Sequence, residues 1–502
     1  MSPSNKKHGE EESLDEVFKP ELVKIVGEDF VVDDPAKIKE NLTDYSFFPK
    51  HYPQYVIFPK TLKEVQKIVK LANKCEIPVI PRSSDVGFYG EGFPAQGGIV
   101  VKLSRMNGIL DINERNRVIR IETGVKWKDI QEPLKKAKLR PNMHLFPHPE
   151  KSVLSSYLER YPSIIPMYEY SEPLGALEVV MGNGVIFRTG SAAGPGKPEE
   201  APDSVKFVDP AGPGSSDFYR IIQGSQGTIC VVTWGSLKVE TIPTLQKACF
   251  LSTENLDSLI ECIYRFQRRM IGYECFVLNN VNWAIILSQQ LSMDYAHLQK
   301  ALPPWVMLLV FGGLKRYPEE KIAYEEEILF EITKEFAFAP QKDLPEIPNA
   351  DQEILKIIGE PWQKDPYWKF SLKGNCCDIF FLTTMDKVPT FDKAIKEKIQ
   401  QLGGSTDSLG VYLQPIEYGR ACHVEYNLFY DETNSEELQR IQEIYREASK
   451  VIYDLGGFFS RPYGIWAEMV YTRDNIYTDT TKKTKEVFDP NNIMHPGYLF
   501  KG

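Results

Sequence analysis

The sequence predicts an α+β protein with more than one domain. The chain has 502 residues, of which 42% are hydrophobic, a size and composition typical of a globular protein with two to four cores. Short apolar runs alternate with short helical patterns up to about residue 240. From about Thr241, longer amphipathic helical patterns alternate with β-type runs, so we expect a second α+β domain there.

Composition and charge exclude several classes of protein. The formal net charge is -10, and no Lys/Arg-rich block is interleaved with aromatic residues, so we expect no nucleic-acid partner. The N-terminus is charged and no 18 apolar residues run together, so we expect a cytoplasmic protein without membrane insertion. The eight cysteines lack C-x-x-C spacing and are expected to be reduced core thiols, with no metal site. Residues 1–15 are expected to form a disordered tail.

The first predicted helix lies in the stretch "TLKEVQKIVKLA", which starts at Thr61. Thr61 occupies the N-cap position and Glu64 follows three residues later, as a capping box requires. The helix feeds a predicted strand over residues 78–81. Four apolar residues share one helical face: Val65, Ile68, Val69 and Ala72.

The rest of the first half reads as short strands and one helix. β-type runs cover residues 97–103 and 117–125, and a helix follows around residues 127–137. The turn signal Gly182-Asn183-Gly184 joins two alternating apolar runs, which predicts a hairpin. Proline and glycine predict a loop over residues 191–216, before strand character returns at residues 223–240.

The second half combines amphipathic helices with a notable β run. Helical patterns cover residues 256–270 and 324–336. In the run "GRACHVEYNLFYD", alternation places His423, Glu425 and Asn427 on one face of a strand. The chain closes with a short helix, a turn at residues 489–491 and an extended tail.

A Gly/Ser-rich loop, "PRSSDVGFYGEG", follows the first predicted strand. Glycine lets backbone N–H groups approach an anion closely, and serine hydroxyls add donors without bulk. The loop matches neither the Walker pattern nor G-x-G-x-x-G. On its own it is compatible with phosphate binding or with a plain connecting turn.

Four sequence segments, taken together, resemble a known family, and this resemblance decides between phosphate binding and a plain connecting turn. They are "PRSSDVGFYG", the unit from "KSVLSSYLER" to "GNGVIFRTG", "IIQGSQGTICVVTWGSLKV" and "FDPNNIMHPG". Their order and approximate spacing resemble flavoproteins of the vanillyl-alcohol oxidase / para-cresol methylhydroxylase family. The resemblance implies a discontinuous FAD-binding domain of two small α+β subdomains, formed by residues 16–240 and 471–502. An inserted α+β substrate or cap domain would occupy residues 241–470.

The same resemblance implies which residues lie near FAD. The cofactor is expected to be bound without a covalent link, because Asp85 and Val86 stand where covalently linked relatives have Gly-Gly-His. His495 would lie beside the flavin ring. The other implied cofactor residues are Pro81, Arg82, Ser83, Ser84, Val86, Gly87, Phe88, Tyr89, Gly90, Ser152, Ser156, Glu159, Gly227, Ile229 and Val232.

The catalytic positions depart from the family pattern. "PHPEKS" puts His148 or Glu150 where the family has its acid, and "RPYGIWAEM" lacks the family's phenol-binding Tyr-Arg pair. His423 suits a general base near pH 7 with Glu425 beside it, and the alternative is a hydrogen-bonded core histidine. The catalytic candidates are His423, His148, Glu425 and Tyr170.

These observations predict an FAD-dependent dehydrogenase. Its first predicted reaction is hydride transfer to flavin N5 from an alcohol-type or alkylphenol-like aromatic substrate. One alternative is a 2-hydroxy-acid dehydrogenase with Arg461 or Arg420 as carboxylate anchor. Another is a flavin-bearing electron-transfer subunit of a larger complex with a degenerate substrate pocket. The expected partners are a small-molecule substrate and an electron acceptor or partner redox protein. The chain is expected to act alone, as a homo-oligomer or as a subunit of a complex, and the sequence does not choose among these.

Overall fold

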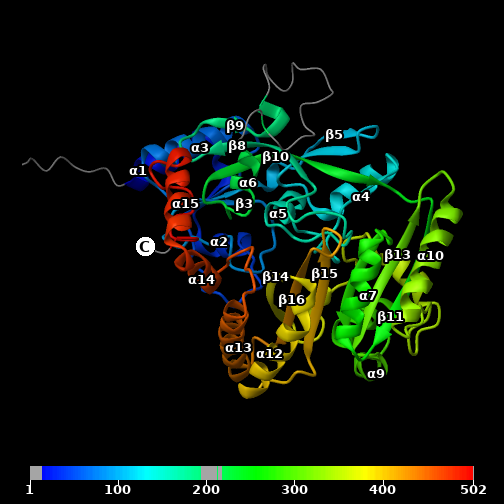
Figure 1. Ribbon diagram of the computed structural model, residues 1–502. Helices are drawn as coiled ribbons and strands as arrows, with labels where there is room; N and C mark the ends of the chain where they lie inside the picture. The colour runs from blue at the N-terminus through cyan, green and yellow to red at the C-terminus, as the bar shows by residue number, and fades with distance from the viewer. Residues whose placement is uncertain (1–13, 194–211, 213–216, 501–502) are drawn as a thin grey trace, which may run out of the picture.

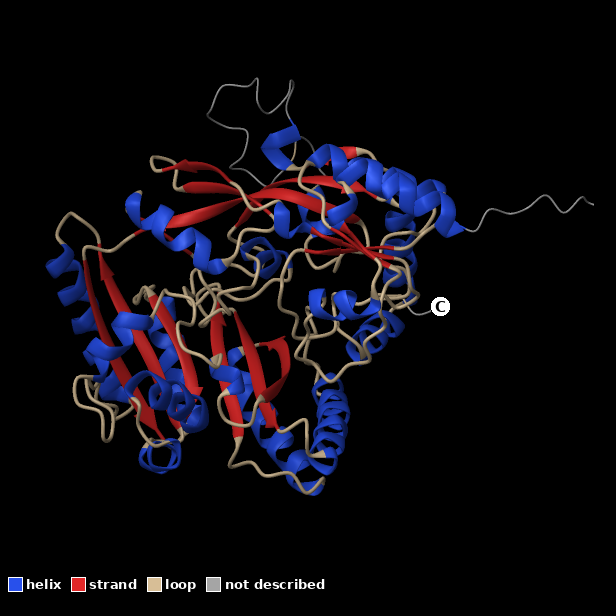
Figure 2. Ribbon diagram, turned by 180° about the vertical axis from the view of Figure 1, so that it is seen from behind, coloured by secondary structure: helices blue, strands red, loops and turns tan. Residues whose placement is uncertain are grey.

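Three sheets organise the computed structural model, which describes residues 14–193, 212 and 217–500. Figures 1 and 2 show the first two sheets stacked above the third, with loops between them. The tail predicted over residues 1–15 lies outside the described residues as far as residue 13, and α1 begins at Leu14. Most of the loop predicted over residues 191–216 also lies outside them.

The first sheet has the order β1-β2-β4-β3, with β2, β4 and β3 parallel. Parallel strands need a crossover connection, and α3 supplies it between β2 and β3, which lie on either side of β4. Its strands are β1 (Val31–Val32), β2 (Tyr55–Ile57), β3 (Val79–Arg82) and β4 (Ile99–Lys102). Its helices are α1 (Leu14–Val26), α2 (Pro35–Asn41) and α3 (Leu62–Lys74).

Helix α3 follows the sequence prediction closely. The Thr61 hydroxyl accepts a hydrogen bond from the Glu64 N–H at 3.2 Å. The Glu64 carboxylate in turn accepts from the Lys60 N–H at 2.7 Å, one residue before the position that a capping box uses. The predicted apolar face of α3 is fully buried, so the helix prediction is confirmed.

The second sheet has the order β5-β6-β10-β8-β9, with β7 paired to β10. The hairpin predicted at residues 182–184 is confirmed, because it joins β8 to β9 in antiparallel register. The strands are β5 (Ile109–Asn113), β6 (Val118–Glu122), β7 (Leu139–Pro141), β8 (Leu174–Met181), β9 (Ile186–Arg188) and β10 (Cys230–Thr241). The helices are α4 (Trp127–Lys136), α5 (Val153–Leu158) and α6 (Phe218–Ile222).

The third sheet is antiparallel, has the order β11-β13-β12-β15-β16-β14, and is covered on both faces. Alternate residues of β13 enter two different cores, with Met307 in one and Leu308 in the other. Its strands are β11 (Leu245–Thr253), β12 (Glu274–Asn279), β13 (Trp305–Gly313), β14 (Asn375–Thr383), β15 (Leu409–Ile416) and β16 (Ala421–Tyr430).

Helices cover this sheet from both sides. One core takes side chains from α7 (Leu256–Arg268), α10 (Pro318–Glu335), α12 (Val388–Gln401) and α13 (Ser435–Asp454). The other takes them from α8 (Asn280–Leu291), α9 (Tyr295–Ala301) and α11 (Ala350–Ile357).

The end of the chain returns to the first sheet. After α14 (Ile465–Arg473) and α15 (Asn475–Phe488), the Val79 N–H donates to the Ile493 carbonyl at 2.7 Å. The His495 N–H donates to the Val79 carbonyl at 3.0 Å. Figure 1 accordingly shows the red C-terminal helices beside the blue N-terminal ones. Segments from both ends of the sequence therefore frame the edge of β3.

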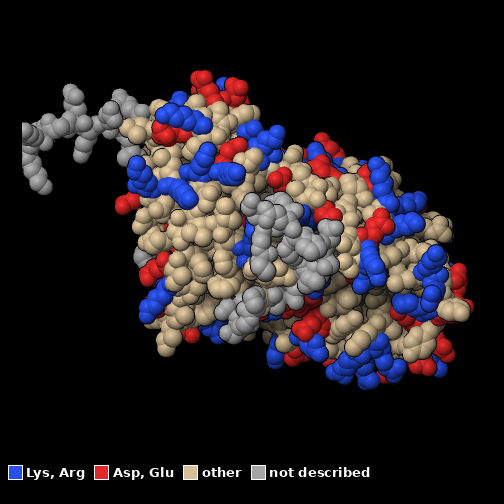
Figure 3. Space-filling view, turned by 90° about the horizontal axis from the view of Figure 1, so that it is seen from above, with Lys and Arg blue, Asp and Glu red and all other residues tan. Residues whose placement is uncertain are grey.

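Charged side chains are interspersed on the face seen in Figure 3, where Lys and Arg alternate with Asp and Glu. In the described part of the chain, no helix is long and apolar enough to cross a membrane.

Candidate active site

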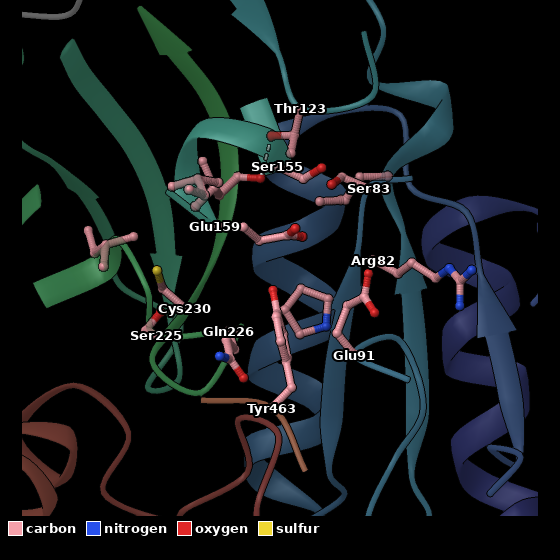
Figure 4. A pocket seen from close by; sticks show the side chains of 16 residues that line it. Arg82, Ser83, Glu91, Thr123, Ser155, Glu159, Ser225, Gln226, Cys230 and Tyr463 are labelled. Atoms are coloured by element: carbon pink, nitrogen blue, oxygen red, sulfur yellow. Dashed lines mark hydrogen bonds between the residues drawn. The ribbon is translucent and has the colours of Figure 1, made fainter. Parts of the chain in front are cut away.

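A first cavity, which we call the cofactor cavity, lies between the loop after β3, helix α5 and the loop before β10. It encloses about 110 Å³, and Figure 4 shows its walls. Of the predicted cofactor residues it is lined by Pro81, Arg82, Ser83, Glu159, Gly227 and Val232. Sequence reasoning missed the other polar residues of its wall, which are Glu91, Thr123, Ser155, Ser225, Gln226 and Tyr463.

Several of these residues fit FAD. Both polar atoms of the Gln226 amide are buried without a partner, so they need a ligand to satisfy them. Ser83 lies at the top of the cavity in Figure 4 and supplies a hydroxyl. Gly227 has φ +76, and a Cβ there would meet Pro81 Cγ at 2.7 Å, so only glycine leaves this wall its shape. These residues offer uncharged hydrogen-bonding groups, and at Gly227 the backbone itself can approach a ligand closely.

Two carboxylates and a ring fill part of the same cavity. Glu91 and Glu159 project towards its centre in Figure 4, and the Tyr463 ring enters from below. Lys151 Nζ lies 3.0 Å from Glu159 Oε2 and neutralises that carboxylate. Ordinary ligand sites enclose roughly 300–1,000 Å³. Some of these side chains must therefore move aside to admit a dinucleotide.

The guanidinium of Arg82 points away from the cofactor cavity, although the segment that carries this residue lines the cavity. Its guanidinium donates to the Ser84 carbonyl at 3.1 Å and to the Thr43 carbonyl, and Figure 4 shows it pointing outward. Ser84, Val86 and Gly87 line a smaller adjoining hollow of about 70 Å³.

Seven other predicted cofactor residues line neither the cofactor cavity nor the adjoining hollow: Phe88, Tyr89 and Ile229, which line other cavities, and Gly90, Ser152, Ser156 and His495. The Ser152 hydroxyl donates to the Thr123 carbonyl at 2.6 Å, and the Ser156 hydroxyl donates to the Ser152 carbonyl at 3.1 Å. The Gly90 N–H is bonded to Asp44. The ring of His495 lies 3.2 Å from the Gln226 carbonyl oxygen and 3.1 Å from that of Phe93, and burial lowers its pKa to about 4. These residues hold the walls in place.

A second cavity, the substrate-side cavity, lies against β14 and β16 of the third sheet. It encloses about 30 Å³ and receives Phe88 and Tyr89 from the loop after β3. Six aromatic rings line it: Phe88, Tyr89, Tyr161, Tyr367, Trp368 and Tyr412. Its polar lining is His144, His148, Lys151, Lys369, Asp378, His423 and Glu425.

A buried charge cluster forms the floor of the substrate-side cavity. Lys369 Nζ lies 2.6 Å from Asp378 Oδ2 and 2.6 Å from Glu425 Oε1. The Tyr89 hydroxyl donates to Asp378 at 3.2 Å. Burial opposes the charge of Lys369, but the two carboxylates outweigh it and raise its pKa. The cluster carries two negative charges and one positive charge.

Strand register brings this cluster together. Asp378 pairs with Asn427, Phe380 with Glu425, and cross-strand partners share a face of the sheet. The Asn427 amide donates to Asp378 at 2.7 Å and to Glu425 at 2.8 Å. The alternation of His423, Glu425 and Asn427 was visible in the sequence, whereas Asp378 and Lys369 carried no signal because their partners lie far away in the chain.

His423 is a buried imidazole beside Glu425. It is completely buried, and its Nε2 lies 3.4 Å from Glu425 Oε2 while its Nδ1 has no partner. If Nε2 carries the proton towards Glu425, Nδ1 presents a free lone pair. Burial lowers the pKa of His423, although Glu425 opposes this. Burial also opposes the charge of Glu425, but Lys369 and His423 outweigh it and lower its pKa.

Arg461 is a buried cation without a hydrogen-bond partner. It is 0% exposed, and Nε, Nη1 and Nη2 all lack a partner. Its Cζ lies 3.6 Å from the centre of the Phe380 ring and 4.1 Å from that of Tyr161. Burial acts against its charge, but nearby tyrosines outweigh it and raise its pKa. An unpaired buried charge is costly, so the site calls for an anion.

Tyrosines surround Arg461 although the sequence lacks the family's Tyr-Arg turn. The rings of Tyr89 and Tyr463 stack with centres 4.6 Å apart, and Tyr463 lies two residues after Arg461. Arg461 and Tyr463 both belong to "RPYGIWAEM", and Tyr89 and Tyr161 come from other segments, so a tyrosine–arginine cluster forms without the family's motif.

The two remaining catalytic candidates occupy different places. His148 lines the substrate-side cavity, its Nδ1 accepts from the Glu150 N–H at 3.2 Å, and burial lowers its pKa to about 4. Tyr170 lines none of the cavities described here, and its hydroxyl contacts that of Ser460. The described residues contain no group of three or more potential metal ligands.

Comparison with known families decides the class of protein. A sequence model described as "FAD binding domain" matches residues 53–190, and one described as "FAD linked oxidases, C-terminal domain" matches residues 384–499. The chain is an FAD-linked oxidoreductase. Its cofactor is FAD, and the α+β architecture is that of the vanillyl-alcohol oxidase / para-cresol methylhydroxylase family, so these three sequence predictions are confirmed.

Curated relatives of this FAD-linked oxidoreductase resemble it along its whole length. Glycolate oxidase subunit GlcD of Bacillus subtilis is 22% identical over 96% of both chains. D-lactate dehydrogenase of Anaerostipes hadrus is 23% identical over 94% of this chain and 93% of its own.

Two solved structures share its fold. The 4-ethylphenol oxidase from Gulosibacter chungangensis superposes with a TM-score of 0.80 at 19% identity, covering 96% of each chain. p-Cresol methylhydroxylase gives a TM-score of 0.79 at 16% identity, covering 96% of this chain and 95% of its own.

Proposed function

We propose that this enzyme oxidises an aromatic alcohol or alkylphenol that Arg461 holds as an anion. The observation that carries the proposal is the buried guanidinium without a partner, beside a cavity lined by six aromatic rings. A guanidinium binds oxyanions strongly in a site that excludes water, and aromatic walls favour a planar ring.

FAD, when bound, supplies the two-electron acceptor. The residues that would hold it are those of the cofactor cavity, chiefly Ser83, Gln226 and Gly227. The Tyr89–Tyr463 stack lies between the two cavities, since Tyr463 lines one and Tyr89 the other. A substrate beside this stack would have its reactive carbon close to the cofactor.

His423 is the proposed proton acceptor. Its Nδ1 takes the proton from the substrate hydroxyl, and its Nε2–H continues to donate to Glu425, whose negative charge stabilises the imidazolium that forms. Lys369 and Asn427 fix Glu425 in this position. Both Arg461 and His423 lie against the Phe380 ring, which supports a role for the two side chains on the same substrate.

An anaerobic substrate panel tests the proposal. The purified holoenzyme is mixed with 4-alkylphenols, benzylic alcohols and 2-hydroxy acids, and bleaching of the flavin absorbance is followed. We expect the aromatic compounds to bleach it. Dithionite serves as the control for a reducible cofactor, and bleaching by dithionite alone would remove the substrate proposal.

A 2-hydroxy-acid substrate is the second candidate. The three unpartnered nitrogens of Arg461 match the two oxygens of a carboxylate, and His423 would again accept the hydroxyl proton. Curated relatives include proteins named for glycolate and D-lactate. Bleaching by 2-hydroxy acids but not by aromatic compounds would favour this candidate. Arg420 is exposed and paired with Glu417, which leaves Arg461 as the anchor for this candidate.

We further propose a cytoplasmic enzyme with non-covalent FAD. All eight cysteines are free thiols, which suits a reducing compartment. Among the described residues of the cofactor cavity there is no histidine, and burial raises the pKa of the Cys230 thiol, which makes it a poor nucleophile. Acid precipitation should release all flavin into the supernatant. We likewise propose two domains: a discontinuous FAD-binding domain of residues 16–240 and 471–502, and a substrate or cap domain of residues 241–470.

A further inference from the structure

A third and larger cavity lies on the far side of the loop at residues 223–229. It encloses about 470 Å³ between this loop, the segment at residues 457–462, and helices α14 and α15. Phe458 and Tyr477 line it and are 52% and 60% exposed, so the cavity is open to solvent. It belongs to neither the cofactor cavity nor the substrate-side cavity.

Only one stretch of backbone separates this cavity from the cofactor cavity. Ser225 lines both. Gln226 and Gly227 line the cofactor cavity, whereas Thr228 and Ile229 line the larger one. A molecule in the large cavity would therefore contact the same loop as the cofactor, from the opposite side.

The lining of the large cavity suits a planar anionic molecule. It combines six aromatic rings with three arginines and a single unpaired carboxylate, that of Asp474. The lysine of the lining is held by Asp489 and so adds no free charge, and Arg220 shares its charge with Glu169, so Arg160 and Arg473 contribute most of the free positive charge. The arginines are Arg160, Arg220 and Arg473, and the rings are Tyr453, Phe458, Phe459, Tyr471, Tyr477 and Phe500.

We propose that this cavity binds the electron acceptor, a quinone bearing a negatively charged substituent. The proposal rests on the FAD-linked oxidation described above, which requires an oxidant to return the cofactor to its starting state. Two electrons would cross the 223–229 loop, and the quinone would take up two protons, one released from the reduced cofactor and one from solvent, to become a hydroquinone. The arginines favour both the anionic substituent and the negative charge that develops on reduction.

Stopped-flow reoxidation of the reduced holoenzyme tests this proposal. The enzyme is reduced with dithionite, so the experiment does not depend on the substrate, and is then mixed with a naphthoquinone sulfonate or with a neutral benzoquinone. In the Arg220→Gln/Arg473→Gln variant we expect the rate with the sulfonate to fall about tenfold, and the rate with the neutral quinone to change less than twofold, because only one acceptor loses an electrostatic partner.

A second variant tests the cavity itself. Thr481→Trp fills it from α15 and should slow both quinones about tenfold, by steric exclusion, while oxygen reoxidises the flavin at the wild-type rate. Lys483→Gln, an exposed charge on the same helix outside the lining, is the matched control. Unchanged flavin content and substrate reduction establish that the variants are folded. Equal quinone rates in wild type and both variants would overturn the proposal, whereas failure of substrate reduction alone would overturn the proposed function and leave this one standing.

Discussion

The cofactor cavity and the substrate-side cavity are built in opposite ways. The first is formed mostly by consecutive residues of a few loops, such as Pro81 to Ser83 and Ser225 to Gly227. The second is formed by residues from separate segments, such as Asp378 and Glu425 on neighbouring strands and Lys369 on the 3-10 turn before β14. A binding site made of consecutive residues can be recognised as a motif in the sequence. The residues of a site assembled across strands are scattered through the sequence as single positions.

The two cavities also differ in charge compensation. At the substrate-side cavity the ion cluster of Lys369, Asp378 and Glu425 is satisfied within the protein, whereas Nδ1 of His423 and the nearby Arg461 guanidinium have no partner. In the cofactor cavity the unpartnered atoms include the neutral Gln226 amide and the Tyr463 hydroxyl. Buried polar atoms without a hydrogen-bond partner indicate where each cavity can bind a ligand. The following substitutions test this interpretation.

Replacing His423 by glutamine should have the largest effect. The rate of flavin reduction is expected to fall about a thousandfold, because general-base catalysis contributes 10²–10⁴-fold. Flavin content should stay unchanged, since His423 lies in the other cavity. Anaerobic stopped-flow absorbance measures both, and a loss of less than tenfold would make His423 a structural residue.

The pH dependence gives an independent check of His423. Burial keeps its pKa below the ordinary value of 6.5, so the imidazole is neutral at pH 7. Protonation removes the Nδ1 lone pair, so the reduction rate should be constant above neutrality and fall only at acid pH. His423→Gln should flatten this acid limb.

Lys369→Met should destabilise the folded protein most. It leaves Asp378 and Glu425 buried without their shared cation, and breaking a buried ion cluster costs about 3–5 kcal/mol. Urea unfolding monitored by circular dichroism measures the loss. The double variant Lys369→Met/Glu425→Gln removes one of the stranded charges and should recover part of it; equal stability of the two variants would argue against the cluster.

Arg461→Met should separate stability from activity. Substrate reduction is expected to fall about a hundredfold, because the anion loses its charged partner. The ligand-free protein should instead gain roughly 1 kcal/mol, because an uncompensated buried charge is removed. A fall in unfolding free energy would show that Arg461 already has a partner within the protein.

Gln226→Leu should weaken FAD binding about tenfold, in line with the loss of one or two hydrogen bonds to buried groups. Quenching of flavin fluorescence on titrating apoprotein measures the affinity. The reduction rate of the saturated enzyme should stay the same, which distinguishes this variant from His423→Gln.

Glu91→Gln should have the smallest effect and the opposite sign. Removing a negative charge from the wall of the cofactor cavity should tighten FAD binding by roughly threefold, less than one full charge pair contributes. The same fluorescence titration applies, and weaker binding would mean that Glu91 accepts a hydrogen bond from the cofactor.

Sequence reasoning predicted the parts of this protein that depend on neighbouring residues. The capped helix α3, the hairpin at residues 182–184 and the alternation of β16 follow from local periodicity and turn chemistry. It missed Lys369, Asp378 and Tyr463, because their roles arise from pairing with distant strands and loops. It also predicted Arg82 near the cofactor, and the residue does line the cofactor cavity, although its guanidinium turns away to the Thr43 carbonyl.

The return of the chain to β3 has a consequence for synthesis. Val79 exchanges backbone hydrogen bonds with Ile493 and His495, and His495 in turn contacts the loop that carries Gln226. On the ribosome, the edge of β3 stays unpaired until almost the whole chain has emerged. The third sheet, which draws only on residues 245–430, is free to form earlier. Flavin capture is therefore expected to be a late event in folding, after the third sheet has formed.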